Sequence, residues 1–259
     1  MALLEVRELS RAFGGLQAVA EVSFAVPERA IKAVIGPNGA GKTTLFNLIA
    51  GSLRPDRGTI LLAGQPLDGL APHRVAARGI ARTFQNVKII RQMTVLENVL
   101  VGCHTRSRGG VVACMLRLPF TRREEARVRA RCHGLLEMLG IAALADAEAA
   151  MLPFGQQRLV ELARALAAEP RLLLLDEPAA GLNMRETAAL AATVRAIRDL
   201  GITILIVEHD MSLVMEVSDE IVALNFGRKI AEGTPQQVRR DAEVVRVYLG
   251  DGDAARQEP

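Results

Sequence analysis

Apolar runs of strand length alternate along the chain with longer segments in which apolar residues recur at helical spacing. This alternation is typical of α/β folds in which helices cover a mainly parallel sheet. Residues 31–35, 172–175 and 202–207 form three such runs and predict buried strands. The third run is rich in β-branched residues and apolar on both faces, as expected for a central strand. The N-terminal stretches LLEVRELS and VSFAV predict antiparallel strands, so we expect a mixed sheet.

The middle of the chain has a different pattern. From about residue 86 to residue 166 helical periodicity dominates, as in VLENVLVG and REEARVRARCHGLLEMLG, and no long strand is predicted. We therefore expect a helical subdomain, residues 86–166, inserted into an α/β core of residues 1–85 and 167–250, with a flexible polar tail at 251–259. Eight arginines lie between His104 and His133. They favour a solvated helix face, and contact with a partner or with lipid headgroups stays open.

Composition narrows the classes of function. Of the 259 residues, 50% are hydrophobic, which is enough for a large buried core. Aromatic residues make up only 3% and the net charge is +3, so we expect no base-stacking surface for nucleic acid. The longest stretch without Asp, Glu, Lys or Arg has 11 residues, whereas a membrane-spanning helix needs about 20. The three cysteines have spacings that match no zinc or disulfide pattern, which suits a reducing compartment.

A glycine-rich stretch after the first buried run matches G-x-x-x-x-G-K-[ST], and a helical segment follows it. Such a loop turns successive backbone N–H groups towards the phosphates of a nucleotide, and the helix adds the positive end of its dipole. Lys42 is expected to reach the β- and γ-phosphates, and the Thr43 hydroxyl to bind Mg²⁺. The predicted nucleotide-binding residues of this loop are Gly36, Pro37, Asn38, Gly39, Ala40, Gly41, Lys42, Thr43 and Thr44.

Two acidic residues follow the apolar run LLLL. Asp176 is expected at the carboxyl end of that strand, which is where ligands bind in open α/β sheets. It is therefore a candidate Mg²⁺ partner, directly or through water. Glu177 is placed to orient an attacking water or to accept its proton.

Further residues distinguish among the classes of P-loop protein. Gln85 lies in ARTFQN after the glycine-rich loop, LPFGQQR opens a strong helix before LLLLDEP, and His209 follows ITILIV. In this order of motifs the chain resembles the ATP-binding-cassette (ABC) ATPases over nearly its whole length. The resemblance implies an α/β P-loop core with a mixed sheet, N-terminal antiparallel strands and an inserted helical subdomain.

The resemblance also implies roles for single residues. Gln85 would sense Mg²⁺ and the attacking water, and His209 would hold the γ-phosphate, so that both act with Glu177 in catalysis. Phe13, in RAFGG, would present its ring to the adenine, a contact worth about 1–3 kcal/mol. His73, His104 and His133 lack such a context and are expected to be structural.

Two further segments would act between subunits. Gly181, Leu182 and Asn183 would form a loop between facing ATPases. The signature segment would contact ATP held by the partner, and it consists of Pro153, Phe154, Gly155 and Gln156. Two departures from the family pattern stand out. Pro153 replaces the usual serine, and Arg29-Ala30 occupies a place where glycine is common and where we expect only a turn to be affected.

Longer stretches narrow the resemblance to the LivG-type ATPases of bacterial branched-chain amino acid importers. They are FGGLQAV, ARTFQNVKI, MTVLENVLVG, PAAGLN, VEHDMSLVM and the ending NFGRKIAEGTP…VYLG. The resemblance implies ATP and Mg²⁺ as cofactors and a second ATPase, like or unlike this chain, as dimer partner. It also implies two membrane permeases, an indirect link to a periplasmic or extracellular binding protein, and a location on the cytoplasmic face of the membrane. Urea or amides remain open as cargo.

Other classes of function fit less well. Cassette ATPases that tether DNA place hundreds of coiled-coil residues between the P-loop and the signature, but Lys42 and Gly155 are only 113 positions apart. Ribosome-acting members carry two cassettes, and this chain has one. A regulatory nucleotide-binding protein would not need Gln85, the LPFGQQR helix and His209 together. We therefore predict a transport ATPase that binds no nucleic acid.

Overall fold

The computed structural model describes residues 1–84, 87–103 and 119–249. The chain divides into two compact units. Met1–Ile80 and Arg171–Pro259 form the first, called the core unit below, and Ala81–Pro170 form the second, called the helical unit. The helical unit begins and ends a few residues outside the segment 86–166 that helical periodicity marks.

The larger sheet of the core unit is mixed, with the strand order β10-β9-β3-β8-β7-β6. The strands β9, β3, β8 and β7 run parallel to one another, and β10 is antiparallel to β9. All residues of β3, β8 and β7 are buried, as their continuous apolar runs predict. The six strands are β3 (Ile31–Ile35), β6 (Ile80–Arg82), β7 (Leu172–Asp176), β8 (Thr203–Val207), β9 (Glu220–Asn225) and β10 (Arg228–Gly233).

A second, antiparallel sheet has the order β2-β1-β4-β5. The two N-terminal strands are longer than the expected LLEVRELS and VSFAV, because the hairpin continues to the turn at Gly14 and Gly15. The mixed architecture predicted from the sequence is confirmed. The strands are β1 (Ala2–Phe13), β2 (Leu16–Pro27), β4 (Arg57–Leu62) and β5 (Gln65–Pro66).

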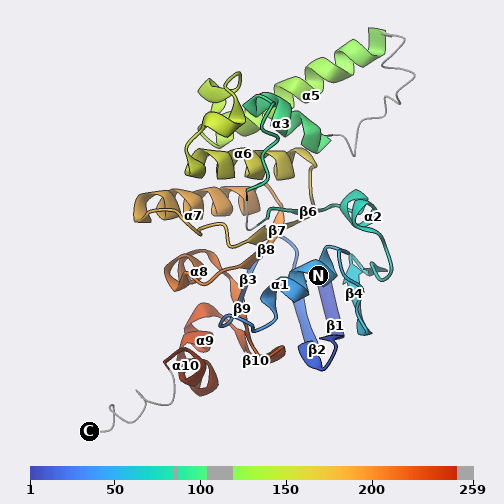
Figure 1. The fold of residues 1–259 in the computed structure, drawn as a ribbon, viewed down its shortest axis with the longest axis vertical. Coiled ribbons are helices and arrows are strands. Elements are labelled where there is room, and N and C mark those ends of the chain that lie inside the picture. The colour runs from blue at the N-terminus through green and yellow to red at the C-terminus, as the bar shows by residue number, and fades with distance from the viewer. Residues whose placement is uncertain (85–86, 104–118, 250–259) are drawn as a thin grey trace. The chain divides into compact units, whose positions relative to one another are not determined.

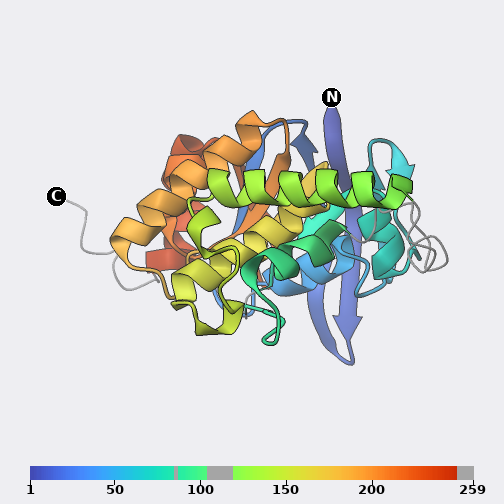
Figure 2. The same cartoon turned by 90° about the horizontal axis from the view of Figure 1, so that it is seen from above.

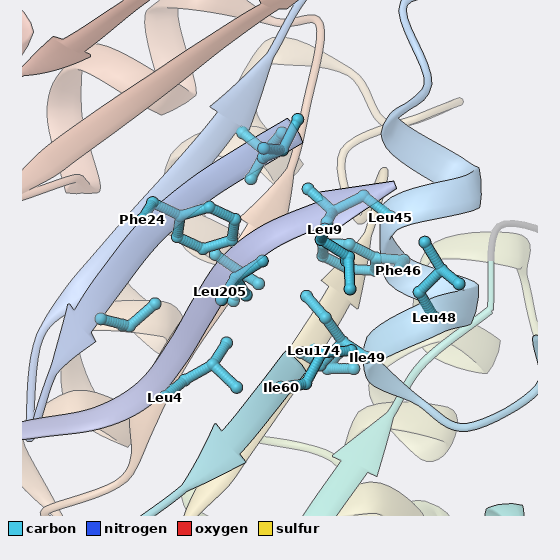
Figure 3. Packing of buried hydrophobic residues seen from close by; sticks show 14 of the residues in the cluster. Leu4, Leu9, Phe24, Leu45, Phe46, Leu48, Ile49, Ile60, Leu174 and Leu205 are labelled. Carbon is cyan, nitrogen blue, oxygen red and sulfur yellow. The ribbon is translucent and has the colours of Figure 1, made fainter. Parts of the chain in front are cut away.

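The main hydrophobic core of this unit lies between the two sheets and around α1 (Lys42–Ile49). Leu4 and Leu9 of β1 and Phe24 of β2 point towards α1 and the parallel strands (Figure 3). Burying one such side chain stabilises the fold by about 1.5–3 kcal/mol. The apolar residues of α1 pack in this core and therefore also fix the position of its first residue, Lys42.

The remaining helices of the core unit surround the strands (Figure 1). The helices α7 and α8 contact each other and lie on the side of the parallel strands away from α1. The short helices α9 and α10 follow β10 and contact it. These helices are α2 (Pro72–Ala77), α7 (Met184–Asp199), α8 (Met211–Val217), α9 (Pro235–Arg240) and α10 (Ala242–Leu249).

In the residues that the structure describes, the helical unit contains the packed helices α3 (Val95–Gly102), α5 (Pro119–Met138) and α6 (Phe154–Ala167), with short 3₁₀ turns at Ala142–Leu144 and Ala149–Met151 (Figure 2). Leu136 and Cys132 of α5 are buried in it, whereas Arg127 and Arg129 are exposed, as a solvated arginine face predicts. The Sγ atoms of Cys103 and Cys132 lie 3.5 Å apart, a proximity that their spacing in the sequence does not reveal.

Buried polar side chains hold the irregular segment before α3. The amide of Asn98 accepts the Ile90 N–H at 2.9 Å and donates to the Ile90 carbonyl at 3.1 Å. The Glu161 carboxylate of α6 accepts the N–H groups of Lys88, at 3.3 Å, and Phe84. Burial raises the pKa of Glu161, and these N–H groups oppose the rise. Backbone groups that lack a strand or helix partner are thereby satisfied.

The place where glycine is common lies in the turn between β2 and β3, and the structure shows backbone strain there. Arg29 has φ = 59°, in the left-handed region, and its side chain is exposed.

We predict that Arg29→Gly increases the free energy of unfolding by about 0.5–1 kcal/mol. Glycine removes the left-handed strain, and the greater entropy of glycine in the unfolded chain cancels only part of that gain. Urea denaturation measures the change. Arg29→Ala keeps the Cβ and is the control, and an equal gain in both variants would contradict the explanation.

Candidate nucleotide-binding site

The carboxyl ends of three neighbouring strands form the candidate site. The strand β8 lies between β3 and β7, and all three are parallel. The glycine-rich loop follows β3, Asp176 and Glu177 lie at the end of β7, and His209 follows β8. The sheet therefore brings together residues that are more than 160 positions apart in the sequence.

The glycine-rich loop approaches neighbouring backbone so closely that two of its positions accept only glycine. A Cβ on Gly36 would lie 2.3 Å from the Leu224 carbonyl oxygen, and one on Gly41 would lie 2.2 Å from the Ala18 carbonyl oxygen. Both residues also have positive φ, 153° and 98°. The close approach to β9 and β2 therefore fixes the path of the loop.

Lys42 begins α1 and is almost entirely buried, with 7% of its surface exposed. Its ammonium group donates to the carbonyl oxygens of Gly36, at 2.6 Å, and Pro37, at 2.9 Å. Burial lowers the pKa of Lys42, and the negative charges of Glu177 and Asp176 oppose this effect. The ammonium thus lies in the electrostatic field of the two carboxylates and under the loop that would surround phosphates.

Asp176 is buried at the end of β7, and Glu177 is only partly exposed. The Glu177 N–H donates to the Val207 carbonyl at 2.9 Å, which ties Glu177 to the end of β8. Glu177 has φ = 46°, a left-handed conformation that costs a non-glycine residue about 1–3 kcal/mol. Such strain is typical of functional positions, where the surrounding structure fixes the direction of a side chain.

His209 lies beside these carboxylates. Its Nδ1 atom is 3.8 Å from Glu177 Oε2 and 3.8 Å from Glu208 Oε2, and its ring is mostly exposed. An exposed imidazole at this edge of the sheet is available to a ligand. Of the catalytic residues expected from the sequence, the structure brings Glu177 and His209 together, whereas Gln85 lies outside the described residues.

Glu208 was not among the residues singled out from the sequence. It is completely buried and accepts the backbone N–H groups of Ala179, His209 and Asp210. Burial raises the pKa of Glu208, and these N–H groups oppose the rise. The sequence contains one hint of this residue, because Glu208 directly follows the apolar run ITILIV. A carboxylate that continues a buried strand is unusual in a protein interior.

The other predicted nucleotide contacts lie around the loop. Thr43 is exposed in the first turn of α1, and Thr44 is partly exposed. Phe13 ends β1 with 44% of its surface exposed, and the Arg11 guanidinium lies 5.0 Å from its ring centre. The hairpin strand paired with it reaches the loop at Ala18. An exposed aromatic ring at this hairpin agrees with adenine stacking better than with a core position.

The loop after β7 ends at a well-formed helix start. Gly181 has φ = 80°, and Asn183 caps α7. The Asn183 side chain accepts the Glu186 N–H at 3.0 Å, and the Glu186 carboxylate accepts the Asn183 N–H at 2.9 Å. Leu182 between them is partly exposed. Asn183 therefore has a structural role in addition to the subunit contact expected from the resemblance.

The signature segment begins α6 in the helical unit. Pro153 occupies the N-cap, rather than the first helical position, and no side chain caps this helix. Phe154 is exposed, and Gly155 and Gln156 are partly exposed. The free N–H groups of this first turn and the helix dipole form a positive end that can meet phosphate.

Comparison with known proteins identifies the class to which this fold and site belong. The family model "ABC transporter" matches residues 19–180, and the model "Branched-chain amino acid ATP-binding cassette transporter" matches residues 228–254. A nucleotide-free ATP-binding cassette from an ABC transporter superposes with a TM-score of 0.84 at 32% identity, covering 97% of this chain and 100% of that one. MJ1267, an ATP-binding cassette of an ABC transporter in its ADP conformation, gives the same values. The fold is that of the ABC ATPases.

Curated relatives define the group within this class. The chain is 44% identical to the high-affinity branched-chain amino acid transport ATP-binding protein LivG of Escherichia coli K12 and 43% identical to BraF of Pseudomonas aeruginosa. Each alignment covers 96% of this chain and 98% of the relative. The lipopolysaccharide export ATP-binding protein LptB of Haemophilus influenzae is 35% identical, with 97% and 98% covered. The chain belongs to the ATP-binding proteins of ABC transporters, in the group of the LivG and BraF ATPases. In the described part of the chain, no helix has the length and apolarity to cross a membrane.

We predict that Lys42→Ala weakens ATP binding about tenfold to a hundredfold, because a charge-assisted contact of about 1.5–3 kcal/mol is lost. Isothermal titration of the purified chain with Mg²⁺-ATP measures the dissociation constant. Lys229→Ala, which removes an exposed ammonium from β10, is the control and is expected to bind like the parent. Equal affinity of Lys42→Ala and the parent would exclude the proposed contact.

Proposed function

We propose that this chain hydrolyses ATP to power the import of branched-chain amino acids through an ABC transporter. The observation that carries the proposal is the convergence of Lys42, Asp176, Glu177 and His209 at the carboxyl ends of three adjacent parallel strands. The family makes the chain an ATP-binding protein of a transporter. The C-terminal match and the LivG and BraF relatives favour branched-chain amino acids as cargo.

The residues fit Mg²⁺ as well as ATP. No group of three or more His, Cys, Asp or Glu side chains gathers to hold a metal within the part of the chain that the structure describes. This agrees with Mg²⁺, which prefers one or two carboxylates, water and substrate phosphates to an all-protein cage. Thr43, an exposed residue in the first turn of α1, and Asp176, at the end of β7, would provide hard oxygen ligands from their hydroxyl and carboxylate groups. Gln85 would be the third contact, partly through water.

The chemistry then follows from position and charge. When bound, Mg²⁺-ATP supplies a γ-phosphate open to in-line attack by water, and the metal neutralises phosphate charge. The loop from Gly36 to Thr44 binds phosphates through its N–H groups, and Lys42 adds a positive charge. Glu177 orients the water and accepts its proton, while His209 contacts the γ-phosphate side. Phe13 stacks on the adenine.

A single chain contains only half of each complete site. The signature residues Pro153 to Gln156 act on the ATP of a second ABC ATPase, and Gly181 to Asn183 form part of the contact between the two. Hydrolysis opens the pair of ATPases and thereby moves two permeases, to which the ATPases bind on the cytoplasmic face of the membrane. A periplasmic or extracellular binding protein delivers the cargo to these permeases. LptB has a closely related sequence and a different cargo in its name, so the ATPase alone does not select the cargo.

We predict that Glu177→Gln retains ATP binding but loses most hydrolysis and transport, because the amide keeps the shape of the side chain and cannot accept a proton. A loss of about a hundredfold in turnover is expected for removal of a general base. ATP binding, phosphate release and uptake of radiolabelled leucine are measured with the assembled transporter. Undiminished phosphate release would exclude Glu177 as the base, and ATP turnover without leucine uptake by the parent would exclude the cargo.

A further inference from the structure

Glu208 is the buried acidic residue at the end of the central parallel strand. It follows directly after β8, and none of its surface is exposed. A carboxylate in the protein interior is costly unless it is paired or accepts several hydrogen bonds. The hydrogen bonds that it accepts therefore reveal what the residue holds in place.

The two oxygens of Glu208 bind two different loops. Oε1 accepts the Ala179 N–H at 2.7 Å, and Ala179 begins the loop that leads to Asn183. Oε2 accepts the His209 N–H at 3.0 Å and the Asp210 N–H at 3.3 Å, where α8 begins. One side chain thus joins the loop after β7 to the loop after β8.

The same strand end also fixes Glu177. The carbonyl of Val207, the residue before Glu208, accepts the Glu177 N–H at 2.9 Å. The His209 ring then lies with Nδ1 3.8 Å from the Glu177 carboxylate. The position of His209 relative to Glu177 is therefore determined by the backbone of Val207 on one side and the side chain of Glu208 on the other.

We propose that Glu208 is a positioning residue for ATP hydrolysis, which holds His209 and the start of the loop at Ala179 in register with Glu177. The inference rests on the proposed function, because it assumes that His209 and Glu177 act on ATP. Only a carboxylate meets both demands, since it accepts hydrogen bonds on both oxygens. A glutamine of the same shape would direct an NH₂ group at an N–H donor on one side.

The test is Glu208→Gln, with Mg²⁺-ATP binding measured on the isolated chain and turnover measured on the assembled transporter. We expect the dissociation constant for Mg²⁺-ATP and the KM to change by less than about twofold, while kcat falls at least about tenfold, because N–H groups left without an acceptor release the loops. Glu208→Asp restores the charge with a shorter side chain and is expected to recover part of kcat. Glu216→Gln, an exposed carboxylate on α8, is the matched control and keeps the parental kcat.

A double-mutant cycle separates positioning from general stability. If Glu208 acts in part through His209, the double variant Glu208→Gln/His209→Ala loses less turnover than the two single losses combined would give. Additive losses, an unchanged kcat in Glu208→Gln, or a matching loss of ATP affinity would each overturn the inference. Should Glu208→Gln fail to fold, Glu208→Asp provides the same split between kcat and affinity. Full turnover in His209→Ala would instead contradict the role of His209 in the proposed function.

Discussion

The parallel pairing of β3, β8 and β7 is the constraint on which the site depends. The register of these strands determines which residues lie side by side at their carboxyl ends. Val34 of β3 and Asp176 of β7 both pair with Val207 of β8. A slip of one residue in any of these strands would turn its buried side chains to the opposite face. All residues of these strands are buried, and all except Lys32, Thr203 and Asp176 are apolar, so such a slip changes packing on both sides of the sheet. Packing of the core therefore fixes the register of the strands, and the register fixes which polar residues lie together at the site.

The site is also a place where the fold buries charge. Lys42, Asp176 and Glu208 all have less than a tenth of their surface exposed. An unpaired charge in this environment would cost several kcal/mol, so each group depends on fixed partners. Lys42 donates to loop carbonyls, and Glu208 accepts three backbone N–H groups. These partners are backbone groups of the loops at the strand ends, so the protein itself orients the charges of Lys42 and Glu208.

Much of this arrangement could be predicted from the sequence, because its strongest signals are local. The glycine-rich loop, the LLLLDE segment and ITILIV each combine a buried strand with the polar residue that follows it. Strand order was not predicted, since periodicity alone does not say that β8 lies between β3 and β7. The structural reason for Gly36 and Gly41, their contact with the carbonyls of Leu224 and Ala18, depends on distant segments and was not predictable.

The features that sequence reasoning missed also depend on contacts between segments that are distant in the sequence. The hydrogen bonds of Glu208 connect loops that follow different strands, and the proximity of Cys103 to Cys132 results from the packing of α5 in the helical unit.

On the proposed function, the ends of these three strands form one half of an ATP site that a partner completes. A structure of the assembled transporter with Mg²⁺ and a non-hydrolysable ATP analogue tests it most directly. We expect the triphosphate in the loop from Gly36 to Thr43, a water within about 3 Å of the Glu177 carboxylate, and the partner's signature helix against the γ-phosphate. A nucleotide enclosed by the signature segment of the same chain, or phosphates held away from Lys42, would contradict it.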